Sequence, residues 1–311
     1  MTERIKTASR ALAEKGIQYE TDAPLAPRTS FRIGGPADLS VFPSDAGQFA
    51  AAFGILKDAG LPCVTVGRGT NLLFSDEGLR GAALFTTSID FCRVSGNLLE
   101  AGAGCRMATA ASRALDASLT GFEFAHGIPG SVGGGVVMNA GAYGGQISDV
   151  LTSMTLFDAE TGVIFEAGPE FAGMTYRHTI FQDDKRYSVL SASFALSEGD
   201  PEQIASRMRE LAAKRRASQP LEYPSAGSVF KRPAPEMYVG KMIEESGLKG
   251  RRIGGAEVSV KHAGFIVNRG GATCSDVLSL IDVVREKLYE NYGVRPEIEI
   301  RVVPCEPDSG R

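Results

Sequence analysis

Two short segments far apart in the chain carry side chains that could bind an anion and move a proton. Arg177 lies between two aromatic residues, and a guanidinium is the natural bidentate partner of a carboxylate or phosphate. Ser228 lies in a turn beside Lys231 and Arg232, whose charges would stabilise the anion left when a hydroxyl gives up its proton. The residue types alone leave simpler roles open, because arginines often form surface ion pairs and turn serines often bond only their own backbone.

Two glutamates, Glu297 and Glu299, stand two residues apart near the end of the chain. This spacing predicts that both side chains point to the same face of a terminal strand. Glutamates on an exposed strand are usually only solvated, so the spacing by itself gives neither residue a role.

A glycine-rich stretch, residues 123–145, is the element around which these side chains would have to be placed. Glycines let the backbone turn sharply and leave N–H groups free to point at a ligand. A plain connector without a ligand is the alternative, but Pro129 and the apolar Val132, Val136 and Met138 favour a packed loop over a flexible linker. With a second glycine loop at 67–76, the stretch predicts a cleft that holds a pyrophosphate on backbone amides and covers a flat ring with apolar side chains.

The second glycine loop follows a buried-type strand expected at 61–66, as in dinucleotide-binding folds. The G-x-G-x-x-G fingerprint fails here because Leu72 occupies the position of the third glycine, and residues 73–76 do not begin a helix. The predicted nucleotide site is therefore not of the Rossmann type.

Composition sets the broad class. The chain has 311 residues, of which 43% are hydrophobic and 23% charged, as in folded multidomain proteins. The N-terminal segment has no apolar signal core and no run could span a bilayer, which predicts a cytoplasmic protein. A net charge of −4 argues against nucleic acid as a partner. Five cysteines without a C-x-x-C pair and three scattered histidines predict neither disulfides nor a metal site.

The hydrophobic pattern predicts an α+β chain. A helix at 3–16 would bury Ile5, Ala8, Leu12 and Ala13, and a helix from 201 would begin with a capping box closed by Gln203. The other predicted helices are 44–60, 105–117, 238–245 and 275–292, and the predicted strands are 82–85, 98–101, 187–196, 257–260, 265–267, 298–303 and a hairpin at 152–166. A break rich in Pro, Ser and Gly at 219–228 predicts a domain boundary.

Taken as a set, these segments resemble the UDP-N-acetylenolpyruvoylglucosamine reductase family. The resemblance rests on residues 29–38, 67–75, 127–144, 176–177, 219–233, 240–250 and 253–268, whose order and spacing together are specific. It implies a two-subdomain FAD-binding domain of the vanillyl-alcohol-oxidase type followed by a smaller α+β substrate domain. The expected domains are 1–91 and 92–218 for the two FAD-binding subdomains, and 219–311 for the substrate-binding domain.

The resemblance also implies a reaction in peptidoglycan synthesis. NADPH reduces FAD and leaves, and the enolpyruvyl sugar nucleotide then takes a hydride at the terminal carbon of its double bond and a proton at the adjacent carbon. The implied ligands are FAD, NADPH and this small nucleotide-sugar substrate, without a nucleic acid, a membrane or an obligatory protein partner. The alternatives are a flavin oxidase of the same fold, and a nucleotide-sugar-binding protein without turnover, which would have no need of a proton donor.

The resemblance assigns roles position by position. Arg177 matches the arginine that braces the substrate carboxylate, Ser228 matches the proton donor, and Glu299 matches the catalytic glutamate, with Glu297 as its rival because it follows a proline. The positions similar to those that hold the sugar nucleotide are Tyr176, Arg216, Gln219 and Lys231. The positions similar to the flavin-contacting loops are Gly67, Gly69, Thr70, Asn71, Gly127, Ile128, Pro129, Gly130, Ser131, Gly134, Met138, Asn139 and Gly141.

Two departures from the family pattern concern the substrate pyrophosphate. Arg232 stands where some members carry Asn. The short passage between Arg177 and Ser228, together with segment 262–265, resembles the subgroup that lacks an extra substrate-covering tyrosine loop. The sequence therefore leaves open how the pyrophosphate is covered, with Lys231 and Arg232 as candidates.

Overall fold

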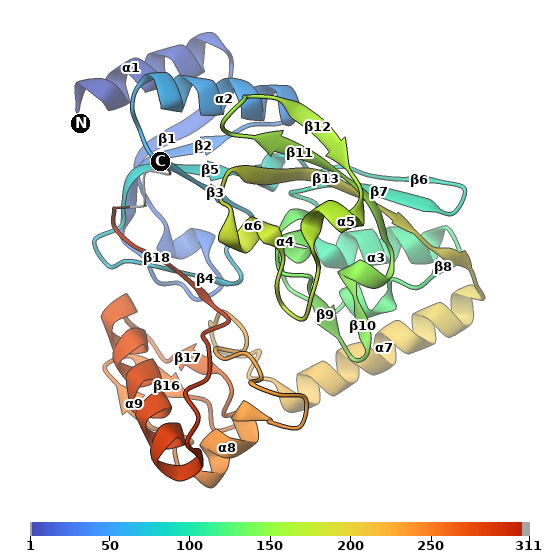
Figure 1. The fold of residues 1–311 in the computed structure, drawn as a ribbon, viewed down its shortest axis with the longest axis vertical. Coiled ribbons are helices and arrows are strands. Elements are labelled where there is room, and N and C mark those ends of the chain that lie inside the picture. The colour runs from blue at the N-terminus through green and yellow to red at the C-terminus, as the bar shows by residue number, and fades with distance from the viewer. Residues whose placement is uncertain (1, 307–311) are drawn as a thin grey trace.

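The structure is a computed structural model that describes residues 2–306, and it confirms the predicted α+β class. Its first sheet has the strand order β1-β2-β5-β3, with β1 (Gln18–Pro24) antiparallel to β2 (Pro36–Phe42), and with β5 (Leu79–Phe85) parallel to both β2 and β3 (Cys63–Val66). Helices α1 (Glu3–Glu14) and α2 (Ala46–Asp58) cover this sheet at the top of Figure 1. Apolar side chains of both helices and of the sheet form one core cluster.

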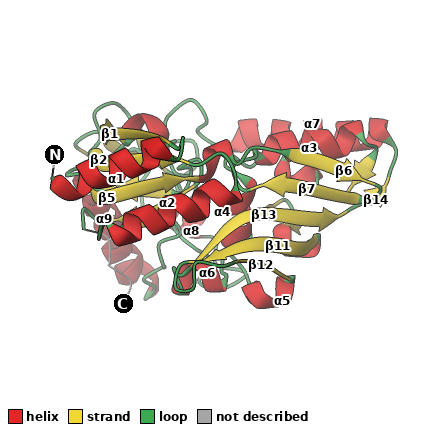
Figure 2. Ribbon diagram, turned by 90° about the horizontal axis from the view of Figure 1, so that it is seen from above, coloured by secondary structure: helices red, strands yellow, loops and turns green. Residues whose placement is uncertain are grey.

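A second sheet carries the middle of the chain. Its strands are antiparallel in the order β12 (Ile164–Ala167), β11 (Leu151–Asp158), β13 (Tyr187–Ala195), β7 (Leu98–Gly102) and β6 (Cys92–Ser95). The β11–β12 pair is the predicted hairpin. Helix α3 (Met107–Asp116) and the long α7 (Pro201–Ser218) lie together beside this sheet in Figure 2, and α3 buries Met107, Ala110, Ala111 and Ala114.

A third, smaller unit follows α7 and occupies the lower left of Figure 1. It combines the sheet β15 (Arg252–Ile253), β16 (Ala256–Val258) and β17 (Ile266–Asn268) with helices α8 (Val239–Glu245) and α9 (Cys274–Tyr292). Helix α9 buries Val277, Ile281, Val284 and Leu288, the four residues that its 3.6-residue periodicity predicts. The predicted domain boundaries are not tested by this arrangement and stay predictions.

The end of the chain returns to the glycine loop at 67–76. Strand β18 (Arg301–Val303) pairs in parallel with β4 (Leu72–Phe74), which directly follows residues 67–71. Phe31, Ile33 and Leu73 also lie in the same core cluster as the inner face of α9. The C-terminal segment is therefore fixed against the glycine loop by both a strand ladder and apolar packing.

A polar contact reinforces this junction. The Asp76 carboxylate accepts hydrogen bonds from the backbone N–H groups of Cys274 at 2.6 Å and Ser275 at 3.0 Å, at the beginning of α9. These amides have no partner within the helix, so Asp76 acts as an N-terminal cap supplied from a distant segment. We expect Asp76→Ala to lower the free energy of unfolding by about 1–2 kcal/mol in urea titrations. Glu77→Ala is the control, and an equal loss in both variants would contradict the capping role.

Several local predictions are wrong. Ala13 is exposed although α1 buries its neighbour Leu12. The strand expected at 61–66 was predicted to be buried. In the structure, β3 lies at the edge of its sheet and pairs only with β5, and of its four residues only Val66 is buried. The predicted capping box of α7 does not form: the Gln203 side-chain amide donates to the Asp200 carboxylate, and within the described residues its oxygen accepts no bond from the Asp200 N–H.

The glycine-rich stretch is also not a continuous loop. Residues Val132–Val137 form the short helix α4, and the Ser131 hydroxyl accepts a hydrogen bond from the Gly134 N–H at its start. The valines supply the buried side of this helix, while the small glycines let it lie against neighbouring segments. A Cβ at Gly133, for example, would lie 2.7 Å from the Cβ of Ala103.

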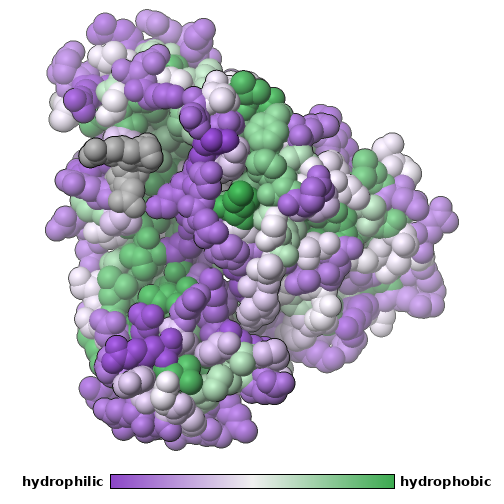
Figure 3. Space-filling model, viewed as in Figure 1, coloured by the Kyte–Doolittle hydropathy of each residue, from purple (hydrophilic) through white to green (hydrophobic). Residues whose placement is uncertain are grey.

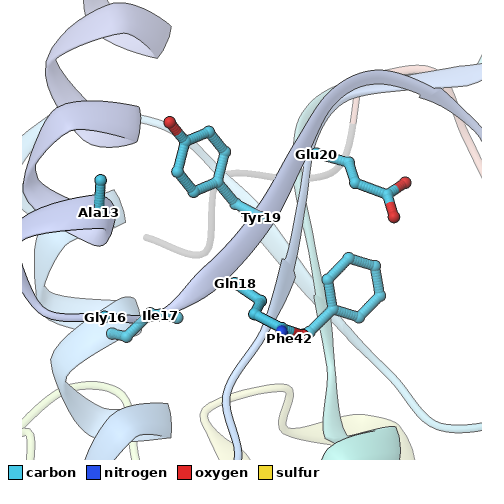
Figure 4. A pocket seen from close by; sticks show the side chains of 7 residues that line it. All are labelled: Ala13, Gly16, Ile17, Gln18, Tyr19, Glu20 and Phe42. Atoms are coloured by element: carbon cyan, nitrogen blue, oxygen red, sulfur yellow. The ribbon is translucent and has the colours of Figure 1, made fainter.

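The surface gives little further indication of function. Polar side chains cover most of the face shown in Figure 3, with smaller apolar patches between them. Within residues 2–306, no helix has the length and the apolar run that crossing a bilayer requires. A groove of about 470 Å³ lies between the end of α1 and β1, with Phe42 on its wall (Figure 4), and it shares no residue with the site described below.

Candidate active site

A pocket of about 520 Å³ contains the three side chains that the sequence marks for chemistry. Arg177, Ser228 and Glu299 all line it, together with residues of α8 and of the loop 261–264. These side chains come from segments on either side of α7, so the fold brings together groups that lie far apart in the sequence. The pocket can therefore present a cation, a hydroxyl and a carboxyl group to one ligand.

The guanidinium of Arg177 is held in place on three sides. Its Nη1 donates to the carbonyl oxygen of Asn139 at 3.2 Å and its Nη2 to that of Gly141 at 2.5 Å. Its Nε lies 3.3 Å from Oε1 of Glu299. The backbone of Arg177 has φ +56°, a conformation that costs energy for a residue with a side chain and that recurs at functional sites. The Gln182 side chain stabilises it by donating to the Arg177 carbonyl at 3.0 Å.

The backbone of Glu299 is held by two hydrogen bonds, and the pKa of its carboxyl is shifted by its surroundings. Its N–H donates to the carbonyl of Val229 at 2.7 Å, and its own carbonyl accepts from the Asn71 side chain at 3.1 Å. Burial raises the pKa of the Glu299 carboxyl, and the nearby charges of Arg177, Lys231 and Arg232 oppose this rise without cancelling it. Glu299 therefore keeps its proton to higher pH than an exposed glutamate does.

The rival glutamate has a different environment. The Glu297 side chain is 78% exposed and pairs with Lys231 at 3.4 Å, whereas the Glu299 side chain is 18% exposed. The prediction that both point to the same face of a strand is wrong, because β18 begins only at Arg301 and the preceding segment forms a single bridge between Phe230 and Ile298. Of the two, only Glu299 lines the pocket.

Ser228 is fixed by its backbone while its hydroxyl remains available. It forms a bridge with Phe265, and the next residue, Val229, donates its N–H to the carbonyl of Gly264 at 2.9 Å. Among the hydrogen bonds of residues 2–306, none involves the Ser228 hydroxyl. A half-buried hydroxyl in a pocket without a protein partner is suited to contact a ligand.

The two glycine loops lie against each other beside this pocket. The Thr70 hydroxyl donates to the Pro129 carbonyl at 3.3 Å, and the Asn71 amide lies 3.4 Å from the Met138 sulfur. A Cβ at Gly67 would lie 2.6 Å from the Ser131 hydroxyl oxygen. The close approach of these loops explains why glycine is needed at that position.

The loops have the properties of a site for a phosphate-containing group. Within the described chain, the backbone N–H groups of residues 67–71, and those of Gly130 and Ser131, donate to no protein acceptor. Rows of bare amides of this kind form anion nests. His126, which directly precedes Gly127, also carries a buried polar atom without a partner in the described chain, its Nδ1. The residues present therefore fit a large ligand with both phosphates and hydrogen-bonding edges, such as FAD.

Other residues named from the sequence fall into two groups. Tyr176 and Arg232 line the pocket, while Arg216, Gln219 and Lys231 are not among its lining residues. Arg216 is exposed and contributes its carbonyl to the Lys261 ammonium at 2.7 Å. Their roles in substrate binding stay predictions.

The side chain and the carbonyl of Asn139 form hydrogen bonds within the protein. Its buried side chain donates to the Thr175 carbonyl at 2.9 Å and accepts from the Ser148 N–H at 3.0 Å. Its carbonyl in turn positions Arg177. The predicted flavin contact of Asn139 is not tested by these bonds.

Tyr238 and His262 also line the pocket, and sequence reasoning gave them no role. His262 lies in a segment that carried the family resemblance, 253–268, and Tyr238 lies just before another, 240–250. Nothing in the residue types indicated that either would meet Ser228. The bridge between Ser228 and Phe265 and the bond from the Val229 N–H to the Gly264 carbonyl bring the loop 261–264 to this place.

The contact between the glycine loops leads to a prediction about the cofactor. We expect Gly67→Ala to weaken FAD binding about tenfold or more, because overpacking of this size typically costs about 1–3 kcal/mol and Ser131 would have to move. Gly54→Ala, where a Cβ would meet nothing within 4 Å, is the matched control. Affinity is measured by titrating the apoprotein with FAD and following flavin fluorescence, and equal affinity in both variants would contradict the role of this contact.

Comparisons with known proteins agree with this geometry. Residues 37–168 match the model of an FAD-binding domain, and residues 219–303 match that of the UDP-N-acetylenolpyruvoylglucosamine reductase C-terminal domain. The UDP-N-acetylenolpyruvoylglucosamine reductase of Clostridium novyi is 44% identical over 281 residues, which cover 90% of this chain and 91% of the relative. The chain belongs to the UDP-N-acetylenolpyruvoylglucosamine reductase family.

Further members of the UDP-N-acetylenolpyruvoylglucosamine reductase family extend the match. The reductase of Latilactobacillus sakei is 44% identical over 291 residues, covering 94% of this chain and 95% of the relative. The crystal structure of the reductase from Thermus caldophilus has a TM-score of 0.78 and 31% identity, covering 92% of this chain and 98% of that one. The resemblance read from the sequence is confirmed, and the chain is an FAD-dependent oxidoreductase with an FAD-binding domain followed by the reductase C-terminal domain.

Proposed function

We propose that this protein reduces UDP-N-acetylenolpyruvoylglucosamine to UDP-N-acetylmuramate, with NADPH as the reductant, in cytoplasmic peptidoglycan synthesis. The observation that carries the proposal is the meeting of Arg177, Ser228 and Glu299 in one pocket beside a cradle of bare amides. The relatives that share most of this chain carry the name of that reductase. The substrate, the nicotinamide cofactor and the residue roles below are parts of this proposal.

The glycine loops would hold the cofactor. Residues 67–71, with Gly130 and Ser131, offer free N–H groups for its pyrophosphate, and the half-buried Ile128 offers an apolar surface for its rings. When bound, FAD supplies the transfer of hydride from NADPH to the terminal carbon of the substrate's double bond. Every other task in the reaction falls to side chains of this chain.

Arg177 would bind and brace the substrate carboxylate. A guanidinium has five N–H donors, and the contacts with Asn139, Gly141 and Glu299 leave others free to face the pocket. Hydride addition at the terminal carbon places negative charge on the adjacent carbon and, by conjugation, on the carboxylate. A fixed cation at that carboxylate stabilises the charge as it develops, without having to reorganise.

Ser228 would donate the proton that completes the reduction. Its hydroxyl has no partner in the described chain, so it can give its proton to the carbon next to the carboxylate. The alkoxide that remains is stabilised by Arg177 and Arg232, which line the same pocket. Glu299 lies against Arg177, and burial raises the pKa of its carboxyl, which in its protonated form would donate a hydrogen bond in the pocket.

A two-step anaerobic stopped-flow experiment tests the function. Purified protein is expected to be yellow and to release FAD on denaturation. NADPH should bleach the flavin, and the enolpyruvyl substrate, added second, should restore its colour and yield UDP-N-acetylmuramate by mass. Colourless protein that cannot be reconstituted with FAD would end the proposal. A reduced protein that ignores the substrate and reacts rapidly with oxygen would instead indicate a flavin oxidase.

A further inference from the structure

The turn that presents Arg177 to the pocket is closed by its own backbone and holds a strained residue. The backbones of Thr175 and His178 exchange two hydrogen bonds, at 3.0 and 3.3 Å, across the two residues between them. Within this turn Arg177 has φ +56°, which a residue with a side chain adopts only where other contacts hold it there. The bonds that close the turn do not involve Arg177, so a contact from outside the turn has to fix its peptide group.

The side chain of Gln182 supplies that contact. Gln182 lies in the short helix α6 (Ile180–Asp183), and its amide donates one hydrogen bond to the Arg177 carbonyl at 3.0 Å and another to the Val137 carbonyl at 3.1 Å. Among the hydrogen bonds within residues 2–306, no other reaches the Arg177 carbonyl. A primary amide has two N–H donors, so this one side chain satisfies both carbonyls at once.

The second of these carbonyls belongs to the segment that also holds the guanidinium. Val137 is the last residue of α4, and within the described chain no backbone N–H donates to its carbonyl. Two and four residues further on, the carbonyls of Asn139 and Gly141 accept from Nη1 and Nη2 of Arg177. The same short segment therefore contacts Arg177 at its guanidinium and, through the Gln182 amide, at its peptide group.

We propose that Gln182 is a positioning residue for the reaction and acts through Arg177 on the carboxylate of the substrate. Gln182 does not line the pocket, so it acts on the substrate only through other residues. Its amide fixes the peptide group that follows Arg177. Without that amide the peptide can rotate, relieve the strained φ angle and move the guanidinium, and a misplacement of about 1 Å can slow a reaction about 10²-fold. The inference rests on the proposed function, in which Arg177 braces that carboxylate.

A neighbouring residue separates positioning from stability. The Thr179 hydroxyl donates to the same Val137 carbonyl at 2.6 Å, and Thr179 is fully buried, but within the described residues it makes no bond to Arg177. Thr179→Val keeps the shape of the side chain and removes this bond, so it should lower the thermal stability without slowing any step of the reaction. Gln182→Met likewise keeps the length of its side chain and removes both donors.

The first test compares two nucleotide sugars that differ in the carboxylate. UDP-N-acetylmuramate carries it and UDP-N-acetylglucosamine does not, and calorimetry measures the binding of each to the FAD-loaded protein. Gln182→Met is expected to weaken UDP-N-acetylmuramate about tenfold, the lower end of what a charge-assisted hydrogen bond contributes, and to bind UDP-N-acetylglucosamine within about twofold of wild type. Thr179→Val should bind both like the wild type. Equal weakening of the two ligands in Gln182→Met, or no weakening of either, would overturn the inference.

Half-reactions and a double-mutant cycle test whether the effect passes through Arg177. In Gln182→Met the enolpyruvyl substrate should reoxidise the flavin about 10- to 100-fold more slowly, while NADPH reduces it within about twofold of the wild-type rate. In an Arg177→Ala background the same substitution should slow reoxidation by less than about twofold more, because residues that act through one contact are not additive. A full additional effect in that background would overturn the inference and leave the reductase function intact. Failure of the wild-type protein to reduce the enolpyruvyl substrate would instead overturn the function on which the inference rests.

Discussion

In the Ser228→Ala variant, NADPH is expected to reduce the flavin at the wild-type rate, while reoxidation by the enolpyruvyl substrate slows about 10²- to 10⁴-fold, the usual contribution of a positioned proton donor. The hydroxyl is needed only when the carbon next to the carboxylate takes its proton. That event belongs to the second half of the cycle, so the first half has no reason to change.

The contacts of Ser228 explain why only the second half-reaction should slow in Ser228→Ala. Its backbone is held by the bridge to Phe265, and its hydroxyl takes part in no hydrogen bond within the described residues. Replacing it by alanine therefore removes a proton donor without breaking an internal contact. The glycine loops, which would hold the cofactor in both half-reactions, and the Arg177 cation remain as they are.

The measurement is a pair of anaerobic stopped-flow traces that follow flavin absorbance, one for each half-reaction. Ser225→Ala is the control, since Ser225 lies in the same turn region and does not line the pocket. Within residues 2–306 its side chain makes no hydrogen bond, while its carbonyl accepts one from the Ser30 hydroxyl at 2.6 Å, which the substitution preserves. Equal slowing of both half-reactions in Ser228→Ala would contradict the role of proton donor.

Local features of the fold could be predicted, and non-local ones could not. The hairpin β11–β12 and the buried face of α9 follow from turn residues and from periodicity, which depend on neighbouring positions. The pairing of β18 with β4 joins segments more than two-thirds of the chain apart, and no local pattern encodes a partner at that distance. Helix α4 was missed because Gly133, Gly134 and Gly135 have low helix propensity, which tertiary packing overrides.

The candidate site divides in the same way. Arg177, Ser228 and Glu299 could be predicted from the sequence because their side chains can bind anions or transfer protons and lie in recognisable motifs. The structure brings all three into one pocket. The difference between Glu299 and Glu297 could not be predicted, since it depends on Val229 and Asn71 holding one backbone segment. Tyr238 was missed because a lone exposed tyrosine has no signal in sequence until its stack with Arg232 is seen.

Replacement of the two glutamates by glutamine should separate their roles. We expect Glu299→Gln to slow the second half-reaction about 10²-fold, within the range for loss of a positioned acid, and Glu297→Gln to leave it within about twofold. Glu299 lies in the pocket against Arg177, while the Glu297 side chain is 78% exposed and pairs with Lys231 at the surface. The larger effect in Glu297→Gln would transfer the role to that residue.

The pH dependence shows whether Glu299 works in its protonated form. Burial raises the pKa of this carboxyl, and a substrate carboxylate bound to Arg177 would raise it further by repulsion between like charges. Below the raised pKa the group holds a proton, and as the pH rises through that value the proton is lost. The wild-type rate of the second half-reaction should therefore fall on the alkaline side, whereas Glu299→Gln, which cannot ionise, should lack that decline. A wild-type rate that rises with pH over the same range would show that the carboxylate is the active form, and Glu299 would then orient Arg177 rather than supply a proton.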